Sequence, residues 1–151
     1  MIDGVIVKLL VTYTDDRGYF REIIKAGESV FADVRQTSVS LLYPGVIKAF
    51  HYHAKQDDIW YIAQGMARVA LYDRREDSPT HGQTQTIVAG EDHPMAIRIP
   101  KGVAHGSQAL GTKPVLLFYH TTEPYNADDP DEGRIPWDDP KIGFDWSVKN
   151  R

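Results

Sequence analysis

Residues 45–65 decide the fold and read Gly45-Val-Ile-Lys-Ala-Phe-His51-Tyr-His53-Ala-Lys-Gln-Asp-Asp58-Ile-Trp-Tyr-Ile-Ala-Gln-Gly65. Successive side chains of a β-strand alternate between its two faces, so His51 and His53 are expected to project from the same face. Buried imidazoles are costly to leave without polar partners. The stretch therefore predicts a polar pocket inside a β-structure. The alternative places one histidine in solvent and the other in an ordinary hydrogen bond.

In the rest of the chain, residues typical of turns recur at short intervals. Polar and apolar residues alternate over 36–42, which predicts a strand with one face toward a polar cavity. Residues 14–18 predict a turn and 25–35 a short helical turn or a loop. Many short strands of this kind are typical of an all-β sandwich or barrel. Strands are expected at 5–13, 19–24, 36–42, 59–62, 67–72, 84–88, 95–99 and 115–120.

From residue 127 onward the chain is rich in aspartate and proline but still contains Trp137 and Trp146. Tryptophan seldom stays fully exposed in a solvated tail, so this short helical or irregular segment is expected to pack on the barrel.

Composition sets outer limits on function. The 151 residues are expected to form one domain, 1–151, and a net charge of −4 gives no case for nucleic acid or an anionic membrane as a partner. The absence of cysteine excludes disulfides and thiolate metal sites. The N-terminus does not resemble a signal peptide, and no apolar run approaches the about 18 residues of a membrane span. A cytoplasmic protein is expected.

Six sequence pieces, in the same order, resemble the dTDP-4-dehydrorhamnose 3,5-epimerase family of the cupin superfamily. The resemblance runs from about residue 12 to residue 146. It implies a double-stranded β-helix, or jelly-roll barrel, and a homodimer with strands exchanged at the subunit interface. It also implies an epimerase or isomerase acting on a nucleotide-diphosphate 4-keto-6-deoxy sugar. The pieces are residues 16–22, 48–52, 72–80, 100–106, 119–125 and 137–140.

The resemblance also implies roles for individual residues. His51 would be the base that removes a proton beside the sugar ketone, and Tyr125 the acid that returns a proton to the opposite face. His105 would face the reacting hexose. Imidazole titrates near neutrality and so suits a base, and inversion needs an acid and a base on opposite faces of the ring.

Binding residues follow from the same resemblance. Arg17 and Glu22 would bind the nucleotide, that of the neighbouring subunit. Composition alone makes the same two residues a solvated turn and an edge charge. Gln36 would contact the phosphates or ribose, and Lys48 the phosphates. Lys48 stands where the family usually has arginine, so its phosphate contact would be a point charge rather than a bidentate fork.

Three departures from the family pattern concern the reacting centre. His53 replaces a family glutamine, and is expected to contact the substrate. Asp58 aligns with a family lysine thought to lie near the enolate. The family's C-terminal aspartate that partners the base lies beyond Arg151, the last residue. The base therefore lacks its usual orienting carboxylate, and the enolate its usual cation.

A metal-binding cupin is the main alternative. The spacing of Gly45, His51, His53, Asp58 and Gly65 follows a metal-binding cupin motif with aspartate in place of glutamate, and residues 100–105 follow a second motif. Three imidazoles and one carboxylate form a recurrent site for divalent transition metals. If a metal were bound, its ligands would be His51, His53, Asp58 and His105.

Two further functions stay open. A sugar 3,4-ketoisomerase of related fold would use His51 and His53 as acid and base, and a non-enzymatic sugar-binding cupin would use neither. The epimerase with no metal is favoured, because Arg17, Glu22 and Tyr125 have no role in a simple metal cupin.

Overall fold

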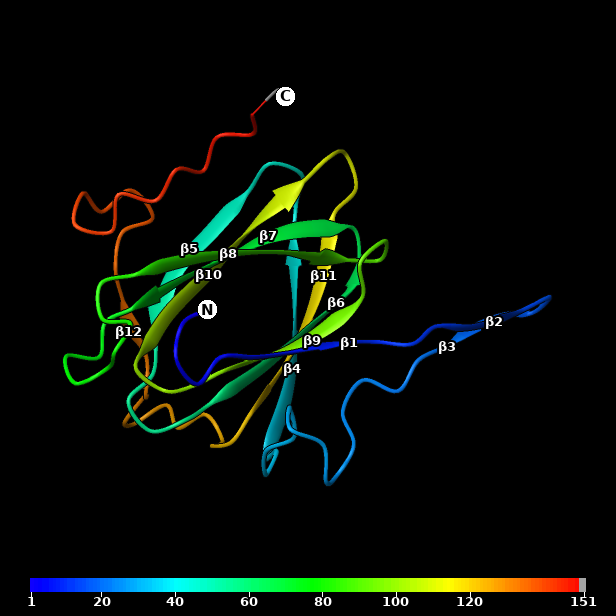
Figure 1. Ribbon diagram of the computed structural model, residues 1–151, viewed down its shortest axis with the longest axis horizontal. Helices are drawn as coiled ribbons and strands as arrows, with labels where there is room; N and C mark the ends of the chain where they lie inside the picture. Colours follow the sequence, from blue (N-terminus) through cyan, green and yellow to red (C-terminus); the bar gives the residue numbers. More distant parts are fainter. Residues whose placement is uncertain (150–151) are drawn as a thin grey trace.

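The computed structural model describes residues 1–149, and all regular structure in this part of the chain is β-strand. Two five-stranded sheets face one another, and a small hairpin projects from them (Figure 1). The all-β jelly-roll expectation is confirmed. Residues 1–149 contain no helix long and apolar enough to cross a membrane.

The first sheet is antiparallel throughout and brings together strands that lie far apart in the sequence. Its central strand, β6 (Asp58–Gln64), is fully buried over most of its length and carries Asp58 at its first position. In order across the sheet, the strands are β1 (Ile6–Leu9), β9 (Met95–Ile99), β6 (Asp58–Gln64), β11 (Val115–Thr121) and β4 (Gln36–Leu42).

The second sheet is also antiparallel and carries two of the three histidines on neighbouring strands. The strands of residues 47–52 and 103–110 approach so closely at Gly106 that a Cβ atom there would lie 2.1 Å from the Cβ of Ala49. In order across the sheet, the strands are β12 (Gly133–Arg134), β5 (Ile47–Tyr52), β10 (Val103–Leu110), β7 (Met66–Asp73) and β8 (Thr84–Gly90).

The main core lies between the two sheets and is built from alternate residues of the strands. Trp60, Leu42 and Leu117 belong to the first sheet, and Val69 and Val103 to the second. Their burial contributes roughly 1.5–3 kcal/mol for each large side chain. This core fills one part of the space between the sheets and leaves the remainder for polar residues.

The turn at Gly65 joins β6 to β7 and so connects the two sheets. Its φ angle is +71°, and a Cβ atom there would lie 2.6 Å from the carbonyl oxygen of Pro114. Glycine suits this position because it has no Cβ and enters positive φ readily.

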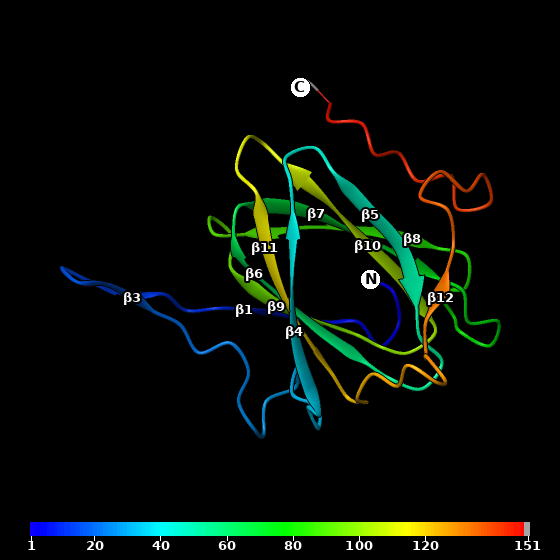
Figure 2. The same cartoon turned by 180° about the vertical axis from the view of Figure 1, so that it is seen from behind.

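The β2–β3 hairpin, formed by β2 (Tyr13–Asp15) and β3 (Gly18–Phe20), projects away from both sheets (Figures 1 and 2). The turn expected at 14–18 is present, but β3 ends at Phe20, short of the strand expected at 19–24. Tyr13, Tyr19 and Phe20 are 57%, 58% and 62% exposed. An apolar arm of this kind is unusual on an isolated molecule.

The C-terminal segment runs along the outer side of the second sheet (Figure 2). It adds β12 beside β5, and its Trp146 lies 5.6 Å from the ring of Phe50. The indole nitrogen of Trp146 donates a hydrogen bond to the carbonyl of Trp137. The expectation that this segment packs on the barrel is confirmed, and within the described residues it is irregular rather than helical.

Candidate active site

A cavity of about 520 Å³ lies between the two sheets and is closed on one side by residues 123–132. Its walls include Ser40 from β4 and Trp60 from β6, beside the histidines of the second sheet. Seven residues singled out from the sequence line it: Gln36, Lys48, His51, His53, Asp58, His105 and Tyr125.

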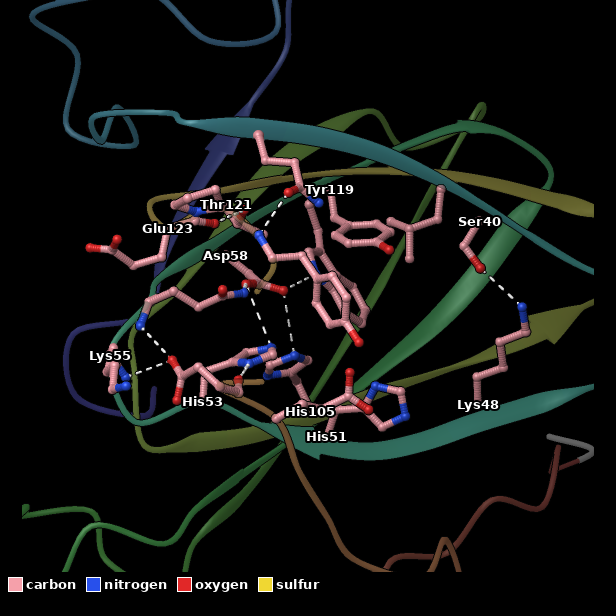
Figure 3. A pocket seen from close by; sticks show the side chains of 18 of the residues that line it. Ser40, Lys48, His51, His53, Lys55, Asp58, His105, Tyr119, Thr121 and Glu123 are labelled. Atoms are coloured by element: carbon pink, nitrogen blue, oxygen red, sulfur yellow. Dashed lines mark hydrogen bonds and ion pairs between the residues drawn. The ribbon is translucent and has the colours of Figure 1, made fainter. Parts of the chain in front are cut away.

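A cluster of two imidazoles and one carboxylate lies at the inner end of the cavity (Figure 3). Nε2 of His53 is 3.8 Å from Oδ1 of Asp58, and Nε2 of His105 is 3.6 Å from Oδ2 of Asp58. Asp58 and His105 are buried, and His53 is half-buried. Burial lowers the pKa of His105 to about 4, although the charge of Asp58 acts in the opposite direction.

Both imidazoles of this cluster are held through their other ring nitrogen. Nδ1 of His105 lies 3.0 Å from the carbonyl oxygen of Val103, and Nδ1 of His53 contacts the carbonyl oxygen of Asp131. A carbonyl can only accept, so each Nδ1 is the donor. Each ring is therefore fixed with its Nε2 toward Asp58.

The carboxylate of Asp58 is held by two donors of its own. Nε2 of Gln56 donates to Oδ1 at 2.8 Å, and Nε1 of Trp60 donates to Oδ2 at 3.1 Å. The Trp60 ring also packs edge-on against His105, with ring centroids 5.1 Å apart. Buried carboxylates need such partners, and here they fix both oxygens.

His51 stands apart from this cluster. It lines the same cavity from β5, and its Cα is the direct partner of His105 across the sheet. Burial lowers the pKa of His51, while the nearby charge of Glu132 acts to raise it. His51 is thus neutral at pH 7 and beside a carboxylate that sequence reasoning did not find.

Tyr125 reaches the cavity from the other sheet, just after β11. Its backbone N–H donates to Oε1 of Gln36 at 2.8 Å, so Gln36 fixes the segment that carries the tyrosine. Gln36 and Ser40 line the cavity as expected from their alternation, whereas Ser38 instead accepts a hydrogen bond from Gln36 at 3.1 Å.

Two ammonium groups lie at the cavity rim. Nζ of Lys48 donates to Oγ of Ser40 at 3.0 Å and to the carbonyl of Leu41 at 2.9 Å. Nζ of Lys55 pairs with Asp129 at 3.0 Å. Both residues are exposed, and the charge of Lys55 is balanced by that of Asp129.

The whole chain, residues 1–151, matches the family model described as dTDP-4-dehydrorhamnose 3,5-epimerase. The chain belongs to this family. It is 55% identical, over 100% of both chains, to the spore coat polysaccharide biosynthesis protein SpsL of Bacillus subtilis. The sequence-based recognition, and with it the assignment to carbohydrate epimerases, is confirmed.

Two solved structures show the same fold. A dTDP sugar isomerase from Desulfovibrio desulfuricans has a TM-score of 0.90 at 27% identity, covering 99% of this chain and 94% of that chain. A dTDP-6-deoxy-D-glucose-3,5-epimerase from Legionella pneumophila, in complex with dTDP-4-keto-L-rhamnose, has a TM-score of 0.87 at 27% identity, covering 99% and 82%.

Two residues that the epimerase resemblance links to the nucleotide lie outside the cavity. Arg17 is at the tip of the β2–β3 hairpin, where its Nε donates to Asp15 at 3.2 Å. Glu22 follows the hairpin and lies 3.9 Å from the amine of Lys25. Within the described subunit, neither residue lines this cavity.

Residues 129–132 are the main part of the epimerase site that sequence reasoning missed. The Asp131 carboxylate accepts hydrogen bonds from three successive backbone N–H groups, those of Ala54, Lys55 and Gln56. Burial would raise the pKa of Asp131, but these three bonds lower it overall. The only signal in the sequence was the density of carboxylates after residue 127.

Proposed function

We propose that the protein is an epimerase or isomerase of a nucleotide-diphosphate 4-keto-6-deoxy sugar, and that it removes a proton next to the ketone. The observation that carries this proposal is that His51 and Tyr125 line one cavity from two facing sheets. A sugar ring bound between the sheets would present one face to each residue. The dTDP-sugar complex of the Legionella relative supports this class of substrate.

In this mechanism the imidazole of His51 accepts the proton from the carbon beside the ketone. Because burial holds its pKa below the ordinary value, the ring is neutral and able to accept a proton at pH 7. Tyr125 then returns a proton from the other face. Substrate and product have the same oxidation state, so the reaction needs no redox cofactor.

The ketoisomerase alternative assigns the acid to His53 instead of Tyr125. In the structure Nδ1 of His53 already donates a hydrogen bond to the backbone carbonyl of Asp131, and its Nε2 faces the carboxylate of Asp58. His53 is therefore less free than Tyr125 to exchange protons with a sugar, which favours epimerisation.

The protein is further proposed to act as a homodimer of one-domain, cytoplasmic subunits. The apolar side chains of the β2–β3 hairpin would be covered by a second copy, and Arg17 and Glu22 would reach the nucleotide in that copy's cavity. Light scattering after gel filtration tests this arrangement. A monomer would overturn it, as would a dimer that persists unchanged when Tyr19 and Phe20 are replaced by serine.

The proposed reaction is tested by incubating the protein with dTDP-4-keto-6-deoxyglucose in deuterated water. Proton NMR should show loss of the signals next to the ketone and the appearance of an inverted sugar. If the substrate keeps its protons at high protein concentration while dTDP still binds, the protein is a binding cupin rather than an epimerase.

A further inference from the structure

We propose that His53, Asp58 and His105 bind a divalent first-row transition-metal ion at the inner end of the cavity. The assignment rests on the geometry of these three side chains and not on the proposed reaction. It differs from the four-residue set suggested by the sequence, because His51 does not belong to the group that the structure brings together.

The three side chains aim their free ligand atoms at one another. One ligand atom from each of His53, His105 and Asp58 lies within 4.8 Å of the other two. Figure 3 shows both rings directed to the same carboxylate. His53 and Asp58 lie at the two ends of the short connection between β5 and β6, whereas His105 comes from β10, so only the fold brings the third ligand to the other two.

These atoms are all hydrogen-bond acceptors. Since Nδ1 of each ring donates to a backbone carbonyl, the Nε2 atom of each neutral ring carries a lone pair. Two lone pairs and a carboxylate oxygen therefore face one another in a mostly buried place. A divalent cation among them would remove this conflict, because all three acceptors can bind it at once.

The surroundings of the three residues match those of metal ligands. A histidine that binds a metal almost always donates its other ring N–H to a carbonyl, carboxylate or water, and a ligating carboxylate is itself hydrogen-bonded. His53 and His105 each donate to a carbonyl, and Asp58 accepts from Gln56 and Trp60. Each Asp58 oxygen keeps a free lone pair after these bonds.

The distances are close to those of a filled site. Ligands at about 2.1 Å from a tetrahedral ion lie about 3.4 Å from one another. The separations of 3.8 Å and 3.6 Å between the imidazoles and Asp58 exceed this by a few tenths of an ångström. Two imidazoles and one carboxylate suit zinc, iron, cobalt or manganese and leave coordination positions open.

The open positions would face the cavity that His51 and Tyr125 also line. A divalent ion there would supply fixed positive charge to an oxygen atom of a bound ligand. The base and the metal ligands are then different residues, so a metal site and proton-transfer chemistry are compatible in one cavity.

The test is Co²⁺ binding by the full chain, after treatment with a chelator and removal of that chelator. Visible absorption during titration should show d–d bands that saturate at about one equivalent. Zn²⁺ should displace them. Asp58→Asn and His53→Gln should each weaken Co²⁺ binding at least tenfold, because each removes one ligand. His51→Asn and His93→Gln, which replace histidines outside the cluster, should bind Co²⁺ like the wild type.

The absence of saturable binding in the wild type would overturn the proposal. So would unchanged binding in both ligand variants, or equal loss in His93→Gln. Circular dichroism of each variant shows whether it is folded. If Asp58→Asn does not fold, His53→Gln still tests the site. Because the readout is binding, it separates the two proposals. If the protein cannot bind Co²⁺ but still exchanges substrate protons, the proposed reaction stands and the metal site is rejected. If it binds Co²⁺ but exchanges no protons, the metal site stands and the proposed reaction is rejected.

Discussion

His51 and His105 are direct partners across β5 and β10, yet only His105 turns its Nε2 to Asp58. One imidazole of this pair is buried and fixed by the Val103 carbonyl, while the other lines the cavity without a hydrogen bond of its own among the described residues. A free imidazole can accept a proton, whereas a fixed one can bind a ligand, so the two rings suit different tasks.

Replacing His51 by asparagine should lower deuterium exchange next to the sugar ketone by about 10²–10⁴-fold, because it removes the general base. Affinity for dTDP should stay close to that of the wild type. The measurement is NMR exchange together with calorimetric binding. Exchange at the wild-type rate would show that another residue is the base, and His53 would be the next to test.

Replacing Tyr125 by phenylalanine should separate the two proton transfers. Exchange at the carbon beside the ketone should continue, since His51 is intact, while formation of the inverted sugar should fall by about 10²–10⁴-fold. Tyr43→Phe is a matched control, because Tyr43 is 70% exposed and outside the cavity. Equal formation of product by both variants would reject Tyr125 as the acid.

Replacing Arg17 by alanine should weaken dTDP binding while leaving the melting temperature nearly unchanged. Arg17 is highly exposed and pairs only with the neighbouring Asp15 among the described residues, so its removal costs little stability. Lys141→Ala, another exposed basic residue, should change neither quantity. A lower melting temperature with unchanged affinity would make Arg17 a structural residue of the hairpin.

Asp73 gives a prediction about stability. It is fully buried, and its carboxylate accepts hydrogen bonds from Arg75, Ser78 and Thr80 at 2.6–2.8 Å. Burial would raise the pKa of Asp73, but these bonds hold it well below its usual value. We expect Asp73→Asn to lower the free energy of unfolding by about 2–4 kcal/mol at pH 7.

The pH dependence of this effect has a definite sign. A carboxyl whose pKa is lowered by folding stabilises the protein above the unfolded value of about 3.9, and this contribution is lost as pH falls below it. The wild-type melting temperature should therefore fall more steeply from pH 5 to pH 2 than that of Asp73→Asn. Asp77→Asn, in the same loop but exposed, should follow the wild type. Parallel curves for Asp73→Asn and the wild type would contradict the assignment.

Much of the fold could be predicted because strand alternation and turn residues are local signals. The strands expected at 36–42 and 95–99 match β4 and β9, and the two histidine motifs do meet. By contrast, β10 was not expected as a strand. Its sequence, Val103-Ala-His-Gly-Ser-Gln-Ala-Leu110, is buried on both faces and lacks clear alternation.

The parts of the site that the sequence did not reveal depend on tertiary contacts. No spacing rule links Asp131 to residues 54–56, because about 75 residues separate them and only the fold brings them together. The same holds for Glu132 beside His51. Conversely, the match of residues 72–80 to the family pattern had no explanation in the sequence alone. The structure explains it, because Ser78 and Thr80 in this stretch donate hydrogen bonds to the carboxylate of Asp73.

The segment around Asp131 forms one wall of the cavity, yet it is not part of either facing sheet until β12 begins. Asn126, Asp129 and Glu132 line the cavity and contribute no apolar side chain to the main core. Substitutions at these three positions are therefore expected to change which sugar fits with little effect on the barrel. Sugar preference and barrel stability are thus separable variables in this wall, except at Asp131, whose carboxylate holds the backbone of residues 54–56.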